Sequence, residues 1–236
     1  MKLLALETST EALSVALSID GEVRERFELA PRRHAELALP WADELLAQAG
    51  VKRSQLDAIA VGRGPGAFTG VRLGIALAQG IALALDRPVV PVSTLAALAM
   101  RAVVPGTQSR ILAAIDARMG EVYAAAYETT ADGLRALSSE VVTAPDAVEL
   151  PDANDGWTGV GTGFDAGEGA LRRRLGARFA TIDAVQLPHA ADVARLATVA
   201  FARGEAVAAE KVEPAYLRNN VALTIAEQQA LRDSRK

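Results

Sequence analysis

The segment from Gly62 to Gly74 carries the strongest chemical signal in this chain, with five glycines and one proline. It joins an expected apolar strand over residues 58–61 to an expected apolar helix over residues 70–85. Glycine allows backbone angles and close approaches that other residues do not. A glycine-rich loop at the start of a helix also presents unpaired N–H groups and the positive end of the helix dipole. The segment therefore predicts either anion binding or close packing of helices.

Residues that could perform catalysis are scarce elsewhere in the chain. The sequence has no cysteine and two histidines, His34 and His189, which lie far apart. Neither histidine belongs to a pair with the spacing of a helical metal site. Each precedes or begins an expected helix, so we expect each to cap that helix or to face solvent. The sequence therefore predicts no catalytic residue and no metal site.

The composition limits the classes of function. Half of the 236 residues are hydrophobic, which is enough for a sizeable core, and 23% are charged, as in soluble proteins. The net charge of -4 gives no general attraction to nucleic acid, and 4% aromatic residues argue against a base-stacking platform. The apolar start is too short for a signal peptide, and no apolar run reaches the ~20 residues of a membrane span. We expect a cytoplasmic protein without membrane contact.

The order of expected elements contains an internal repeat. Strands are expected over residues 2–6, 13–19, 22–29, 58–61, 89–92, 111–115 and 122–127, and helices over residues 35–49, 70–85 and 94–103. The first and second strands, and the last two, share one pattern: an apolar strand that ends in a carboxylate, Glu7 or Asp116, then a polar turn and another strand. Such duplication suggests two similar lobes that face a cleft. The alternative is that any two αβ lobes begin in this way.

Two expected helices carry more apolar surface than a helix on a sheet needs. Over residues 35–49 there are two apolar stripes, and over residues 70–85 the helix is apolar almost all round. In the second helix, small residues repeat every four positions and would let another helix approach closely. Either both helices are buried in a three-layer fold, or one face of each is a protein interface. We favour the interface, with Leu39, Ala42, Leu46, Gly70, Arg72, Gly74, Leu77, Ala78 and Ile81 as its residues.

Four motifs together resemble the bacterial TsaB (YeaZ) family of tRNA threonylcarbamoyladenosine biosynthesis. They cover residues 5–10, 62–74, 115–123 and 214–220, and the match runs in order from Met1 to about Val221. The resemblance implies an actin-like (ASKHA), ribonuclease-H-like α/β fold of two lobes, with mixed sheets flanked by helices. We expect residues 1–104 to form the first lobe, residues 105–213 the second, and residues 214–236 a segment that returns to the first.

The resemblance also implies the function. The chain would be a non-catalytic paralogue of TsaD, the subunit that transfers threonylcarbamoyl to the adenosine beside the tRNA anticodon. It would bind TsaD through its first lobe, support assembly with the ATPase TsaE, touch tRNA only through the complex and form a homodimer when alone. Thr94 and Leu98 stand where TsaD-type catalysts carry metal-binding histidines, and neither replaces imidazole.

No cofactor is required in this reading, although ATP or ADP at the interface with the partner is an expectation to test. Its candidate binding residues are Glu7, Thr8, Asp116 and Arg118. Two other functions stay open. An actin-like ATPase or small-molecule kinase would bind nucleotide as an isolated chain. A peptidase of the glycoprotease type would need a nucleophile or a metal that the sequence does not reveal.

Overall fold

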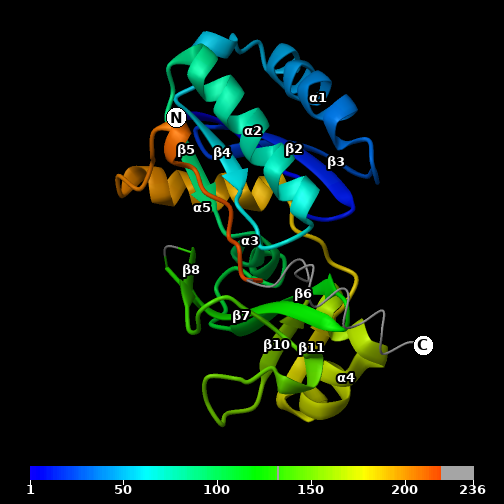
Figure 1. The fold of residues 1–236 in the computed structure, drawn as a ribbon. Coiled ribbons are helices and arrows are strands. Elements are labelled where there is room, and N and C mark those ends of the chain that lie inside the picture. Colours follow the sequence, from blue (N-terminus) through cyan, green and yellow to red (C-terminus); the bar gives the residue numbers. More distant parts are fainter. Residues whose placement is uncertain (132, 219–236) are drawn as a thin grey trace, which may run out of the picture.

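The computed structural model describes residues 1–131 and 133–218, which form two lobes, each built on one β-sheet (Figure 1). The first sheet has the order β3-β2-β1-β4-β5, and the second has the order β11-β10-β6-β7-β8, with β9 paired to β7. The strands are β1 Lys2–Glu7, β2 Ala12–Ile19, β3 Glu22–Leu29, β4 Ala58–Gly62, β5 Val89–Val92, β6 Arg110–Arg118, β7 Glu121–Thr130, β8 Gly133–Ala136, β9 Val141–Thr143, β10 Trp157–Val160 and β11 Phe179–Asp183. The helices are α1 His34–Gln48, α2 Phe68–Leu85, α3 Thr94–Met100, α4 Ala166–Leu175 and α5 Ala190–Ala202.

The two sheets share one topology. In the first, β1 pairs antiparallel with β2 and parallel with β4, and β2 and β4 extend the sheet to β3 and β5. In the second, β6 pairs antiparallel with β7 and parallel with β10, and the sheet continues to β8 and β11. The predicted two-lobed α/β fold with mixed sheets is therefore confirmed, and the carboxylates Glu7 and Asp116 occupy equivalent strands.

Helices cover both faces of the first sheet. On one face, α1 and α2 pack over β1, β2 and β4, and their core includes Trp41, Leu45 and Ile75. On the other face lies α5, whose alanines Ala190, Ala194 and Ala197 are fully buried against the sheet. Figure 1 shows α5 crossing behind the upper sheet, opposite α1 and α2. A short side chain lets a helix lie close to a sheet, so the alanine-rich composition fits this three-layer lobe.

The position of α5 corrects the predicted lobe boundary. We expected residues 105–213 to form the second lobe, but α5 is part of the first. After α5, Val207 exchanges two backbone hydrogen bonds with Val89 of β5, at 2.8 and 2.9 Å. Next, the Gln79 side chain of α2 donates to the carbonyl of Ala209 at 2.9 Å. The first lobe is therefore discontinuous in sequence, because it needs a second sheet-covering helix that comes from beyond the second lobe.

Helix α3 lies at the junction of the two lobes (Figure 1). Its Ala97 belongs to the core under α5, whereas Leu95 and Leu98 belong to a core formed with β6 and β7. Close by, Arg63 of the first lobe forms an ion pair at 3.2 Å with Glu140 of the second. The lobes are therefore joined by apolar packing and by charge.

Helix α2 is strongly apolar, although most of its residues are not buried within the protein. Its mean hydropathy is 1.6 over 18 residues, yet 28% of these residues are buried within the protein. Within the described residues it is the one helix long and apolar enough to cross a membrane, judged by length and composition alone. It begins at Phe68, two residues before the predicted start, because Ala67 donates its N–H to the carbonyl of Ser9 at 2.7 Å and anchors the first turn.

We predict opposite effects for two glycine substitutions in α2. A Cβ at Gly70 would lie 2.1 Å from the carbonyl oxygen of Thr8, whereas one at Gly80 would meet nothing within 4 Å. Gly70→Ala should therefore lower the free energy of unfolding by about 2 kcal/mol through overpacking. Gly80→Ala should raise it by about 0.5–1 kcal/mol because alanine favours the helix. Urea denaturation of both variants measures this, and equal effects would contradict the close approach at Gly70.

Candidate functional site

A cleft of about 910 Å³ lies between the lobes. The first lobe contributes the turn between β1 and β2, the residues around the start of α1, and the start of α2 with the loop before it. The second lobe contributes the turn between β6 and β7 and Thr162, and the chain segment 215–218 closes one side. The cleft is thus the place where the two carboxylate-bearing hairpins face each other, as the sequence repeat predicted.

The glycines of the 62–74 segment let this segment approach the turn between β1 and β2 closely. A Cβ at Gly66 would lie 2.4 Å from the carbonyl oxygen of Ser9, and one at Gly74 would lie 2.5 Å from Oγ1 of Thr8. Thr8 Oγ1 also donates to the carbonyl of Gly70 at 2.7 Å. The prediction that Gly70, Gly74 and Ala78 admit a second helix is therefore wrong, because Gly70 and Gly74 face the turn after β1 and Ala78 is buried in the core of the first lobe.

Glu7 is the buried centre of this arrangement, with 1% of its surface exposed. Its Oε1 accepts the N–H of Ser9 at 2.7 Å, and its Oε2 accepts the hydroxyl of Thr94 at 3.1 Å. Thr94 in turn accepts the N–H of Gly64 at 3.2 Å and is 3.0 Å from the hydroxyl of Ser9. A Cβ at Gly62 would lie 1.9 Å from Glu7 Oε2. One carboxyl group therefore ties the turn, the glycine-rich loop and α3 together.

Burial raises the pKa of Glu7 above its ordinary value, and the hydrogen bonds from Ser9 and Thr94 oppose this only in part. The group is enclosed and does not line the cleft. Thr8 is also fully buried. The prediction that Glu7 and Thr8 bind a nucleotide is thus corrected, since neither side chain is accessible to a ligand.

Asp116 and Arg118, the other two predicted nucleotide residues, do line the cleft. They form an ion pair at 2.9 Å, and the N–H of Arg118 donates to Asp116 Oδ1 at 2.7 Å. Asp116 also donates its own N–H to the hydroxyl of Thr162 at 3.1 Å. Arg118 and Met119 both have positive φ angles, 62° and 56°, which non-glycine residues rarely adopt. In the second hairpin, the acid Asp116 therefore lies at the cleft surface and is paired with Arg118. In the first hairpin, the acid Glu7 is buried.

The two histidines behave differently from the prediction. His34 is 8% exposed, and its Nε2 donates to the carbonyls of Thr10 and Ala12 at 3.1 and 3.0 Å, so it neither caps α1 nor faces bulk solvent. His189 precedes α5 but pairs with Glu25 at 2.9 Å and stacks on Phe27 at 4.0 Å between ring centroids. Burial alone would raise the pKa of Glu25, but hydrogen bonds from His189, Ser14 and Ala191 hold that pKa below its usual value.

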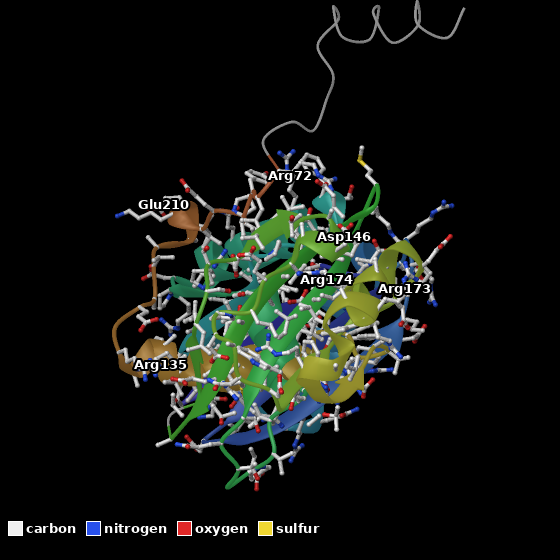
Figure 2. The ribbon with its side chains drawn as sticks, turned by 90° about the horizontal axis from the view of Figure 1, so that it is seen from below. Arg72, Arg135, Asp146, Arg173, Arg174 and Glu210 are labelled. Atoms are coloured by element: carbon white, nitrogen blue, oxygen red, sulfur yellow. The ribbon has the colours of Figure 1, made fainter. Side chains whose placement is uncertain are left out.

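The segment 214–218 contacts both lobes, a role that the composition alone does not reveal. Ala215 donates its N–H to the carbonyl of Arg63 at 2.9 Å, and the Tyr216 hydroxyl accepts from Nε of Arg72 at 2.7 Å. On the other side, Arg218 pairs with Glu121 of the second lobe. Figure 2 shows Arg72 beside this end of the described chain. The predicted return of residues 214–236 to the first lobe thus holds for Ala215 and Tyr216, Arg218 contacts the second lobe, and residues 219–236 lie outside the described part.

The nine predicted interface residues divide by exposure. Leu39 and Arg72 are exposed, and Gly70, Leu77 and Ile81 are half-buried. The remaining four, Ala42, Leu46, Gly74 and Ala78, are buried in the first lobe and are corrected here to core residues.

In the described residues there is no cluster of three or more histidine, cysteine, aspartate or glutamate side chains that could hold a metal ion. Thr94 belongs to the Glu7 hydrogen-bond network, and Leu98 is fully buried in the core with β6.

Comparison with known proteins gives the family. A family model described as "TsaD: tRNA N6-adenosine threonylcarbamoyltransferase" matches residues 27–226. The chain is 44% identical to the tRNA threonylcarbamoyladenosine biosynthesis protein TsaB of Escherichia coli, over 94% of this chain and 96% of that protein. It is 41% identical to TsaB of Haemophilus influenzae, over 94% and 95%. The chain belongs to the TsaB (YeaZ) family.

Solved structures agree with this assignment. YeaZ from Pseudomonas aeruginosa superposes with a TM-score of 0.85 and 49% sequence identity, covering 92% of this chain and 99% of that one. A second structure from that organism, with the same scores, is described as an uncharacterized protein with similarity to peptidase YEAZ. The actin-like fold and the link to tRNA threonylcarbamoyladenosine biosynthesis therefore follow from the family.

We predict that Glu7→Gln changes how stability depends on pH. Because folding raises the pKa of Glu7 from 4.5, its contribution to stability is full below that value and is lost as the pH rises through the folded-state pKa. Glutamine can accept from Ser9 and donate to Thr94 without this loss. Relative to the unchanged protein, Glu7→Gln should gain stability as the pH rises above 4.5 towards the folded-state pKa of Glu7, measured by urea denaturation at a series of pH values.

Glu7→Ala is the control, and it should lose about 2 kcal/mol or more near pH 4, where the Glu7 contribution is full, because Ser9 and Thr94 lose a buried partner. A constant difference between Glu7→Gln and the unchanged protein across this range would contradict the raised pKa.

Proposed function

We propose that this chain is a non-catalytic subunit that binds a TsaD-type threonylcarbamoyltransferase and supports threonylcarbamoyl modification of the adenosine beside the tRNA anticodon. The observation that carries the proposal is the outer face of α2. Ala76, Gly80, Leu83 and Ala84 are exposed there, and Leu83 is 66% exposed. An apolar helix face that the protein itself leaves uncovered is typical of a protein interface.

The proposed partner surface is the outer face of α2 together with the exposed part of α1. Leu39 of α1, 45% exposed, adds a large apolar side chain to it. Arg72, Leu77 and Ile81, three of the predicted interface residues, lie along the same helix and belong to this surface. When the partner is absent, a second copy of this chain covers the same surface and gives a homodimer.

We expect no catalytic activity from the isolated chain, and the residues at the junction of the lobes support this expectation. Threonine and leucine, at positions 94 and 98, offer no metal ligands of the imidazole type, and the Glu7 carboxyl is enclosed. We place the chain in the cytoplasm, in a complex that also includes a TsaE-type ATPase and contacts tRNA through its partners. ATP or ADP at the interface with the partner would lie against Asp116 and Arg118.

Reconstitution tests this function. TsaC-type, TsaD-type and TsaE-type proteins are combined with tRNA, with and without this chain, and threonylcarbamoyladenosine is measured while complexes are followed by size-exclusion chromatography. We expect both modification and a stable complex to depend on this chain. Modification without it, or no complex with the TsaD-type protein, would overturn the proposal.

The same samples address the two other functions. Nucleotide turnover by the isolated chain would support an actin-like ATPase or kinase, and cleavage of a protein substrate would support a peptidase. We expect neither activity.

A single charge on the outer face of α2 should break the interface. We predict that Leu83→Glu weakens both homodimer and heterodimer by about tenfold or more, because association would bury an unpaired carboxylate. Sedimentation velocity measures both, and circular dichroism checks the fold. The control is Val185→Glu, at a residue that is 79% exposed and lies in the connection between β11 and α5. Unchanged association of Leu83→Glu would exclude this face as the interface.

A further inference from the structure

The segment 214–218, which we call the strap, runs over the surface from the first lobe to the second (Figure 1). It follows Val212, which is 5% exposed and belongs to the core of the first lobe. From there to residue 218 the chain forms no helix or strand, and none of the residues 213–218 is buried. The strap is therefore anchored in the first lobe at one end and lies on the surface along its whole length.

On the first lobe, the strap is attached mainly through one arginine of α2. Cζ of Arg72 lies 3.8 Å from the centre of the Phe68 ring and 5.4 Å from the centre of the Tyr216 ring. Its Nε also donates to the Tyr216 hydroxyl at 2.7 Å. A guanidinium group over aromatic rings is favourable, more so when water is excluded, but both rings here are about half exposed.

On the second lobe, the strap is held by Arg218 alone, and all of its contacts are with the turn between β6 and β7. Arg218 forms an ion pair with Glu121, and its Nη2 donates to the carbonyl of Ala117 at 3.4 Å. Its Nη1 lies 3.5 Å from Sδ of Met119. This turn belongs to the hairpin that carries Asp116 and lines the cleft. The strap thus links the start of α2 to the opposite wall of the cleft.

The other links between the lobes lie at their junction. The chain crosses there twice, through residues 101–109 between α3 and β6 and through residues 184–189 between β11 and α5. Helix α3 packs against the cores of both lobes, and Arg63 pairs with Glu140 at 3.2 Å. Two lobes joined in this way can rotate about the junction as a hinge. A link from α2 to the β6–β7 turn limits that rotation.

The contacts of the strap are of a kind that breaks easily. The side chains of Arg218 and Glu121 are 20% and 37% exposed, and solvent-exposed ion pairs contribute little net stability. Within the described residues, one backbone hydrogen bond holds the strap, from Ala215 to the carbonyl of Arg63 at 2.9 Å. Segments with few buried contacts open locally at a low cost in free energy. The strap can therefore leave the second lobe while both lobes stay folded.

We propose that the strap is a releasable clamp that sets the width of the cleft. With Arg218 on the β6–β7 turn, the cleft has a volume of about 910 Å³. When Arg218 leaves Glu121, the second lobe rotates about the junction, the hairpin moves away from the start of α2, and the cleft widens. This motion belongs to the chain itself, so it stands whether or not the outer face of α2 binds a partner.

Distances between spin labels test the clamp, and the lack of native cysteine lets the labels be placed freely. One label replaces Ala35, which lines the cleft on the first lobe, and the other replaces Ala177, between α4 and β11 of the second lobe. Both positions are exposed. Double electron–electron resonance on the full-length chain then gives the distribution of the distance between the labels. We expect Arg218→Gln to raise the ratio of open to closed molecules by about fivefold.

Matched variants separate the clamp from a general loss of charge. Arg135→Gln removes an arginine that pairs with Glu128 inside the second sheet, and it should leave the distances unchanged. Arg218→Glu and Glu121→Arg should each favour the longer distance, because like charges then face each other. The double variant Arg218→Glu/Glu121→Arg should restore the shorter distance, because opposite charges meet again.

Either of two results would overturn the clamp. The first is one and the same distance distribution for the unchanged protein, Arg218→Gln and Arg218→Glu. The second is a longer distance in both single variants that the double variant does not reverse, which would mean that the pair itself does not hold the lobes. Because neither a partner protein nor tRNA is present, these measurements are independent of the reconstitution of tRNA modification.

Discussion

The buried carboxyl group of Glu7 is the constraint on which the rest of the first lobe depends. It lies where the end of β1, the glycine-rich loop and the start of α3 meet, and it satisfies donors from Ser9 and Thr94. The absence of a side chain at Gly62 is what gives the carboxyl its space. A buried polar group of this kind is costly unless its partners are in place, so it favours one arrangement of the three segments over alternatives.

The two lobes use the same topology for different purposes. In the first hairpin the strand-end acid is enclosed and holds neighbouring segments together, while in the second Asp116 remains on the cleft surface and pairs with Arg118. The first hairpin therefore lines the cleft with a turn that the buried Glu7 holds in place. The second hairpin lines it with the ion pair of Asp116 and Arg118. The segment 214–218 joins the two walls, because Tyr216 contacts Arg72 and Arg218 contacts Glu121.

Much of this architecture follows from the sequence. Apolar strands that end in Glu7 and Asp116 indicated two similar lobes, and the four motifs indicated the family. The packing of small residues could not be read in the same way, since a stripe such as Gly70, Gly74 and Ala78 looks alike whether it faces a helix or a strand. The environment of His34 was also hidden, because its partners, the carbonyls of Thr10 and Ala12, are distant in the chain and carry no side-chain signal. The assignment of α5 failed for a similar reason, as an alanine-rich helix fits the sheet of either lobe.

Helix α5 of the first lobe follows the whole second lobe in the sequence, and this order affects how the protein folds during synthesis. Residues 105–188 form a unit inserted into the first lobe, because α5 and the strand-like contact of Val207 with Val89 come after it. During translation from the N-terminus, one face of the first sheet, including Ala5, Ala16 and Ala60, stays uncovered until α5 leaves the ribosome. The second lobe is therefore complete before the first, and the nascent first lobe exposes an apolar sheet that chaperones can recognise.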